Sequence, residues 1–205
     1  MSQVKTVVGI VGVSLAYATL RNNVFKDVPW SQWPAWVTNK AAALAALLLL
    51  LAALLRAGRD GGHGRLLAAA SILAMIHITL SLALLGPAAY PGLFANGLPT
   101  MPASLSLLLG VVAAVAAPRV SRPEGPGAPP RFRPASVGIL ALVVGLHAGL
   151  LGFQGWATPG KWPGGMPPIT LISFAAGLLA VILGWKRHRE GTARPPRTGA
   201  HDAAN

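Results

Sequence analysis

Six long apolar segments, almost free of charge, restrict what this chain can fold into. Each covers roughly 20 residues, the length that an α-helix needs to cross the hydrocarbon core of a bilayer. Only 11% of the 205 residues are charged, whereas soluble domains carry about 25% charged residues. The sequence therefore predicts an all-α integral membrane protein surrounded by lipid. It is expected to be a six-transmembrane-helix bundle with spans at 4–20, 36–55, 66–86, 101–117, 135–154 and 168–185.

The predicted membrane domain covers residues 1–189 and leaves no room for a separate soluble domain. Residues 190–205, EGTARPPRTGAHDAAN, are polar and proline-rich, which predicts a disordered cytoplasmic tail. No strand is expected. The chain contains no cysteine, so disulfides, thiolate metal sites and iron–sulfur clusters are excluded.

Positive charge is distributed unevenly over the connections between the predicted spans. Thirteen of the 17 Lys and Arg residues lie at the N-terminus, after spans two and four, and in the tail. The alternate connections hold the other four, Arg21, Lys26, Lys40 and Lys161. Lys and Arg accumulate on the cytoplasmic side of a membrane, so both termini are predicted to be cytoplasmic. This layout accounts for the formal charge of +12 without a nucleic-acid partner. The abundance of Ala, Gly, Pro and Arg suggests a bacterial cytoplasmic (inner) membrane.

Two of the five histidines interrupt predicted spans. His77 lies in AMIHITLSL, 11 residues after the inner edge of span three, and His147 lies in VVGLHAGLL, 12 residues after the inner edge of span five. At about 1.5 Å per residue, both lie about 17 Å from the cytoplasmic edge of a core about 30 Å thick. Spans three and five run in the same direction, so the two imidazoles are predicted to lie at one depth.

Matched depth is what a heme held by two histidines requires, because the ligands occupy opposite faces of one iron. Imidazole is a common axial ligand of heme iron, and ionisable residues inside a span are candidates for function. Small residues beside His147, such as Gly145 and Gly149, are expected to let a flat macrocycle approach the helix. The alternative is that each histidine only forms a hydrogen bond between helices. The remaining histidines, His63, His188 and His201, are predicted to be solvated loop or tail residues.

Six spans with histidines on the third and fifth resemble the ferric-reductase-like transmembrane domain superfamily. The resemblance covers residues 4 to 186 and rests on the architecture and on His77 and His147. Because no second histidine pair follows on these helices, it implies the single-heme branch, with one heme b. It also implies a monoheme b-type cytochrome subunit that carries electrons within or across the membrane. The acceptor would be a quinone, a metal or a periplasmic partner protein.

Any oxidoreductase activity would depend on a partner, because the chain has no glycine-rich dinucleotide-binding fingerprint. Heme propionates carry negative charge, and the cations nearest the predicted heme level are Arg21, Lys40 and Lys161. We expect one or more of them to pair with a propionate, the alternative being that they are ordinary interface anchors.

Two other functions remain open from the sequence. A heme-free structural or assembly subunit could bind partner helices through faces of small residues, such as Gly9 and Gly12. A transporter of neutral solutes is the second alternative, because all five acidic residues lie outside the predicted spans and ion-coupled carriers usually need an acid within the membrane.

Overall fold

The computed structural model describes residues 2–56, 63–120 and 132–192. Within them, six helices are long and apolar enough to cross a membrane. The prediction of a mostly helical chain with six membrane-length helices is therefore confirmed. The helices are α1 (Gln3–Thr19), α2 (Thr38–Arg56), α3 (His63–Ala83), α4 (Met101–Val120), α5 (Pro134–Gly152) and α6 (Ile169–Thr192).

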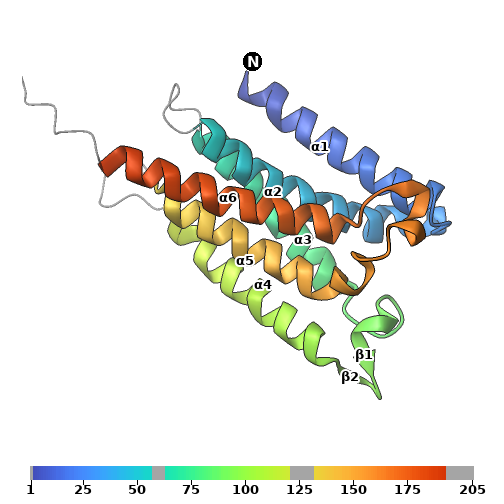
Figure 1. The fold of residues 1–205 in the computed structure, drawn as a ribbon. Helices are drawn as coiled ribbons and strands as arrows, with labels where there is room; N and C mark the ends of the chain where they lie inside the picture. Colours follow the sequence, from blue (N-terminus) through green and yellow to red (C-terminus); the bar gives the residue numbers. More distant parts are fainter. Residues whose placement is uncertain (1, 57–62, 121–131, 193–205) are drawn as a thin grey trace, which may run out of the picture.

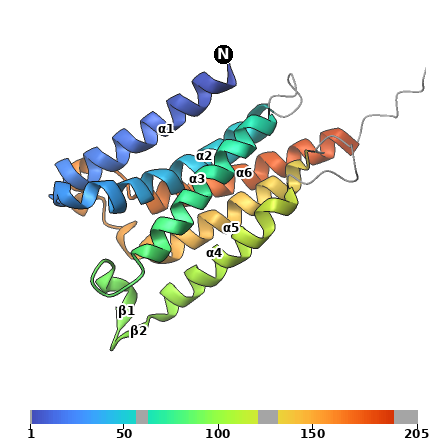
Figure 2. The same cartoon turned by 180° about the vertical axis from the view of Figure 1, so that it is seen from behind.

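The helices form an up-and-down bundle (Figures 1 and 2). The first residues of α1, α3 and α5 and the last residues of α2, α4 and α6 lie at one end of it. The most extensive helix contact is between α5 and α6, followed by α2 with α3 and α4 with α5. α1 lies at the periphery and packs mainly on α2.

α2 is the central helix, and its sequence explains why. Its stretch AAALAALLLLLAALL is apolar on every face, as expected of a helix with neighbours all round. α2 packs against α1, α3, α5 and α6, and 61% of its most apolar window is buried, compared with 11% for α1. Its Leu47, Leu49 and Leu54 are among the most completely buried side chains.

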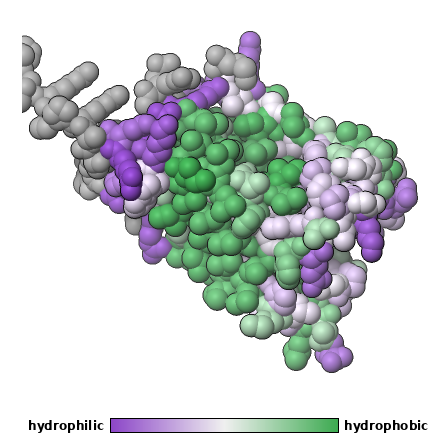
Figure 3. All heavy atoms as spheres, viewed as in Figure 1, coloured by the Kyte–Doolittle hydropathy of each residue, from purple (hydrophilic) through white to green (hydrophobic). Residues whose placement is uncertain are grey.

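The surface of the bundle fits a lipid environment. Figure 3 shows a broad hydrophobic band over the middle of the helices, with hydrophilic residues gathered towards both ends. Large apolar side chains on the outer helices are exposed, for example Val8 at 65%, Ile72 at 62% and Ile182 at 63%. The side of the membrane on which each end lies stays a prediction.

Glycines bring α5 and α6 into close contact. A Cβ on Gly138 would lie 2.8 Å from the carbonyl oxygen of Ala180, and a Cβ on Gly177 would lie 2.8 Å from that of Ala141. Gly145 likewise faces the backbone of α6. Small residues at such positions let transmembrane helices approach until their backbones touch, so this face of α5 is fixed by α6.

The prediction that the chain has no strands is wrong. A short antiparallel hairpin joins α3 to α4, with strands β1 (Phe94–Ala95) and β2 (Leu98–Pro99). Asn96 and Gly97 both have positive φ, 53° and 78°, and an Asn-Gly pair is the preferred two-residue turn of a hairpin. Strands of two residues are too short to show an alternating pattern of apolar and polar residues. The Asn-Gly pair could nevertheless have predicted the hairpin turn.

The predicted boundary of the tail is also shifted. α6 continues to Thr192, so the first three residues of the segment 190–205, predicted to be disordered, are helical. The remainder of that segment lies outside the described residues, as does most of the connection between α4 and α5.

Candidate functional site

The two histidines predicted to share a depth, His77 on α3 and His147 on α5, are neighbours. Their ring centroids lie 6.2 Å apart and their planes are inclined at 74°. Both residues are partly buried. Within the described part of the chain, α3 packs mainly on α2 and makes no extensive contact with α5. The two imidazoles therefore approach each other from helices that have little direct contact and that both pack on α2.

His147 is anchored by Ser106 of α4. Nδ1 of His147 lies 2.7 Å from the carbonyl oxygen of Ser106 and 3.0 Å from its Oγ. The Ser106 hydroxyl donates to the carbonyl oxygen of His147 at 2.8 Å, so it closes a reciprocal pair of bonds between the two helices. Ser106 is 1% exposed, and this pair fixes the height of α4 relative to α5.

His77 is anchored by Asn39 in the first turn of α2. Nδ1 of His77 lies 2.7 Å from Oδ1 of Asn39. Nδ2 of Asn39 donates to Oγ of Ser81 at 3.0 Å and to the hydroxyl oxygen of Tyr90 at 3.2 Å. Burial raises the pKa of the Tyr90 phenol, more than the hydrogen bond from Asn39 lowers it, so the phenol is neutral at physiological pH. The Asn39 amide thus ties α2 to α3 and to the connection that follows α3.

These partners define the tautomer of each ring. A carbonyl or amide oxygen only accepts hydrogen bonds, so Nδ1 carries the proton in both His77 and His147. Nε2 of each ring is then a lone-pair donor, and neither Nε2 forms a hydrogen bond within the described residues. Metal-ligating histidines commonly donate the other ring N–H to an oxygen acceptor that fixes tautomer and orientation, and both rings fit that pattern.

Gly110 on α4 gives the His147 ring its space. A Cβ at this position would lie 3.2 Å from both Cε1 and Nδ1 of the ring.

The glycines next to His147 in sequence have other roles. Gly145 faces the backbone of α6, and Gly149 faces the Trp156 ring. The expectation that Gly145 and Gly149 make room for a macrocycle is therefore wrong, because they lie on the opposite face of α5.

The three candidate cations are spread over the end of the bundle where α1 ends and α2 begins. Nε of Arg21 donates to the carbonyl oxygens of Pro167 at 3.0 Å and Met166 at 3.4 Å. Nζ of Lys40 lies 3.3 Å from the centre of the Trp36 ring. Lys161 is exposed in the connection between α5 and α6. None of these contacts involves His77 or His147, and Lys40 is the residue that follows Asn39 on α2.

The other histidines lie away from this pair. The ring of His63 packs on Phe132 with centroids 4.4 Å apart, and that of His188 lies 6.2 Å from the Trp185 ring. His63 and His188 are helical, the first residue of α3 and part of α6, so placing them in a loop and in the tail was wrong. His201 lies outside the described residues.

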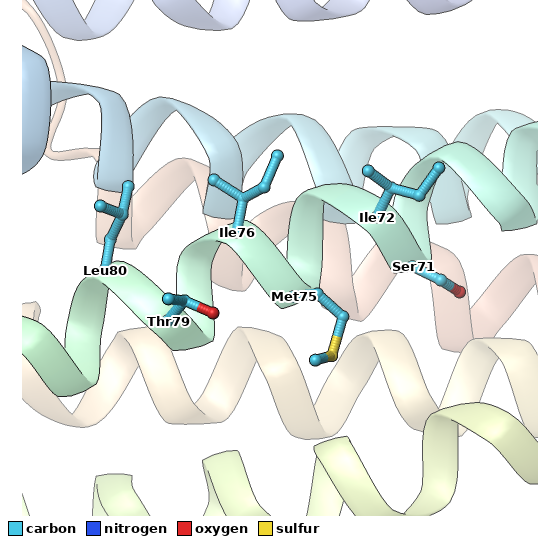
Figure 4. Close-up of a pocket in the computed structure, with 6 residues that line it drawn as sticks. All are labelled: Ser71, Ile72, Met75, Ile76, Thr79 and Leu80. Atoms are coloured by element: carbon cyan, nitrogen blue, oxygen red, sulfur yellow. The ribbon is translucent and has the colours of Figure 1, made fainter.

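A hollow on the surface of α3 is not part of this site. It has a volume of about 520 Å³ and is lined by residues of α3 only. Figure 4 shows Ile72, Ile76 and Leu80 on one side of the helix and Met75 pointing to another. By helical geometry Met75 lies about 160° around α3 from His77. Ile72, Met75 and Ile76 are exposed, so the hollow opens on the outer surface of the bundle.

Sequence reasoning missed Asn39, Ser106, Tyr90 and Gly110. Two of them could have been found from the sequence. Asn39 and Ser106 are polar residues that lie within predicted spans, near the end of the bundle at which His77 and His147 are also expected. The choice of partner depends on which helices are neighbours, and the sequence did not show that.

Comparison of the chain with protein-family models, with curated proteins and with solved structures found no match. The described residues contain no group of three or more His, Cys, Asp or Glu able to hold a metal ion. The pair of imidazoles can therefore supply two ligands, and further ligands would come from a bound group.

Proposed function

We propose that this protein is a single-heme b-type membrane cytochrome in which His77 and His147 ligate the iron through Nε2. One observation carries the proposal, namely the separation of the two rings. Two imidazoles on opposite sides of one iron have centroids about 6.2 Å apart, from metal–nitrogen bonds of about 2.0 Å and about 1.1 Å from each nitrogen to its ring centre. The observed separation is 6.2 Å.

The donor set also fits the group. A heme would bring the other ligands of its iron, so His77 and His147 would be the two ligands that the chain supplies. When bound, the heme supplies one-electron redox chemistry. The chain orients the two rings through Asn39 and Ser106 and keeps Nδ1 protonated so that Nε2 can bind. Its apolar helices exclude water from the site.

Of the three cations proposed as propionate partners, Lys40 is the best placed. It follows Asn39, and Asn39 contacts His77 directly. Lys40 Nζ is also held on the Trp36 ring rather than on a carboxylate. Arg21 would have to exchange its bonds to Met166 and Pro167, and Lys161 would have to fold inward from an exposed position.

The distribution of Lys and Arg supports an orientation with both termini in the cytoplasm of a bacterial cell. The site then lies in the outer half of the inner membrane, because Asn39 is near the outer end of α2. Electrons would leave towards a quinone, a metal or an outer partner protein.

The test is an absorption spectrum of the purified protein from heme-replete cells. We expect a Soret band, an α band that sharpens on reduction, and one heme per chain. His77→Ala and His147→Ala are expected to abolish bis-histidine ligation, whereas the matched variants His63→Ala and His188→Ala keep the wild-type spectrum. A folded but colourless wild type would overturn the proposal.

A heme-free assembly subunit is the second candidate, and α1 gives it one specific observation. A Cβ on Gly9 or Gly12 would meet nothing within 4 Å, so this small-residue face has no partner helix within the described residues. A colourless wild type that co-purifies with another membrane protein, and loses it on Gly9→Leu, would favour this function.

A further inference from the structure

The two ligand rings are held in chemically different ways. Nδ1 of His147 donates to a main-chain carbonyl, that of Ser106, which stays an acceptor whatever side chain stands there. Nδ1 of His77 instead faces the side-chain amide of Asn39. An amide has an acceptor end and a donor end, so its orientation decides which nitrogen of His77 carries the proton.

We propose that Asn39 is the positioning residue that makes His77 competent to bind iron. The inference rests on the heme ligation proposed above. With Oδ1 towards the ring, the proton is held on Nδ1 and Nε2 presents its lone pair. With Nδ2 towards the ring, Nδ1 would accept and the proton would move to Nε2, which could not then bind a metal.

The surroundings of Asn39 hold the amide in place. Its side chain is 2% exposed, and its Nδ2 has two oxygen partners, Ser81 Oγ at 3.0 Å and the Tyr90 hydroxyl at 3.2 Å. Both N–H groups of the amide therefore have oxygen acceptors other than His77. The Ser81 hydroxyl lies 3.3 Å from Oδ1 and 3.4 Å from His77 Nδ1, so it closes the network around the ring.

The network has a consequence for the iron. An acceptor on Nδ1 increases the basicity of a ligating histidine, and a more basic ligand favours the ferric state. The strength of this acceptor is set by the side chain at position 39, whereas that on His147 is set by the main chain. His77 is thus the ligand through which substitutions in α2 change the reduction potential.

The experiment uses the full-length protein with heme and two substitutions at Asn39. Asn39→Asp has an acceptor at both oxygens, so it removes the reversed orientation, and we expect heme to be retained with a lower reduction potential than wild type. Asn39→Leu removes the acceptor, and we expect heme affinity to fall about 10- to 100-fold, as for other outer-shell partners of ligating histidines. Tyr90→Phe keeps Oδ1 and is expected to give a smaller fall.

Matched controls are available at Asn23. Its side chain is also buried, 6% exposed, but its Nδ2 donates to the carbonyl oxygen of Val28 at 2.8 Å and not to a histidine. Asn23→Asp and Asn23→Leu should keep the wild-type potential and heme affinity. If the Asn39 variants keep both, or if the Asn23 variants change both to the same extent, Asn39 has no positioning role.

Two further measurements keep the inference testable. If Asn39→Leu does not fold, the potential of Asn39→Asp decides, since a wild-type value overturns the inference. If the wild type is colourless, the proposed function fails, and ¹⁵N NMR of labelled histidine in the heme-free protein tests Asn39 separately. A His77 signal with the proton on Nδ1 supports the inference, and one with the proton on Nε2 overturns it.

Discussion

Replacing Gly177 with alanine tests whether contact with α6 positions the helix that carries His147. The new Cβ would lie 2.8 Å from the carbonyl oxygen of Ala141 and 3.2 Å from Cα of Gly145. Ordinary contact begins at 3.4 Å, so α5 and α6 would have to separate locally by about 0.6 Å, the difference between 3.4 and 2.8 Å. The obstacle is the backbone of α5, which cannot rotate away as a side chain can.

The cost of this separation can be worked out from known packing energies. Inserting one carbon into a close-packed contact costs about 1–3 kcal/mol. The better helix propensity of alanine recovers about 1 kcal/mol of this, so the net loss is up to about 2 kcal/mol, and for a chain of this size the melting temperature falls by up to roughly 8 °C. His147 lies on the face of α5 opposite Gly145, so the shift would push its ring towards Gly110 of α4.

Thermal unfolding in detergent, followed by circular dichroism, measures the change for Gly177→Ala. The matched control is Gly12→Ala, because a Cβ on Gly12 meets nothing within 4 Å. Alanine favours a helix by about 1 kcal/mol over glycine, so the control should be as stable as the wild type or more stable. Both variants gain this propensity, so the packing argument is refuted if Gly177→Ala melts at or above the temperature of Gly12→Ala.

Three other outcomes are expected. Gly110→Val places a branched side chain where one Cβ is already 3.2 Å from the His147 ring, and the Soret absorbance per chain should fall well below that of the wild type. Ser106→Ala keeps the carbonyl acceptor of His147 and loses only the hydroxyl, so unfolding should become easier by about 1 kcal/mol while heme is retained, as measured by denaturant titration and heme content. Replacing Tyr17 with Phe leaves Tyr90 as the only tyrosine in the chain. Burial raises the pKa of the Tyr90 phenol from its ordinary value of 10.0. The ultraviolet absorbance change that accompanies ionisation of this phenol should therefore have its midpoint above pH 10. The folded state then holds the phenol proton more tightly than the unfolded state, so stability should fall as pH rises above 10.

The spans were predictable because the physics that defines them is local. A helix in lipid must satisfy its own backbone and be apolar over roughly 20 residues, and both properties can be read from one segment at a time. The depth of His77 and His147 followed from counting along two such segments, and the two rings are indeed neighbours. The identity of a bound group stays a prediction.

The partners of the histidines were not predictable in the same way. Asn39 reaches His77 only because α2 packs on α3, and Ser106 reaches His147 only because α4 packs on α5. These neighbour relations depend on packing across the whole bundle.

The glycines of α5 could be predicted only in part. The seven-residue spacing of Gly138 and Gly145 is visible in the sequence. Only the structure shows that these glycines contact the backbone of α6 and do not line a cofactor site.

The hydrogen bonds of the two rings support the proposed ligation over a purely structural role for the histidines. A structural histidine between helices stabilises the bundle by using its polar atoms on protein partners, because an unpaired polar atom in a membrane is costly. His77 and His147 each use Nδ1 in this way, on Asn39 and Ser106. Each leaves Nε2 without a hydrogen bond in the described part of the chain, and the two rings meet at 6.2 Å. A metal held between them uses both lone pairs at once, whereas an assembly subunit would need a partner helix that brings a separate donor to each.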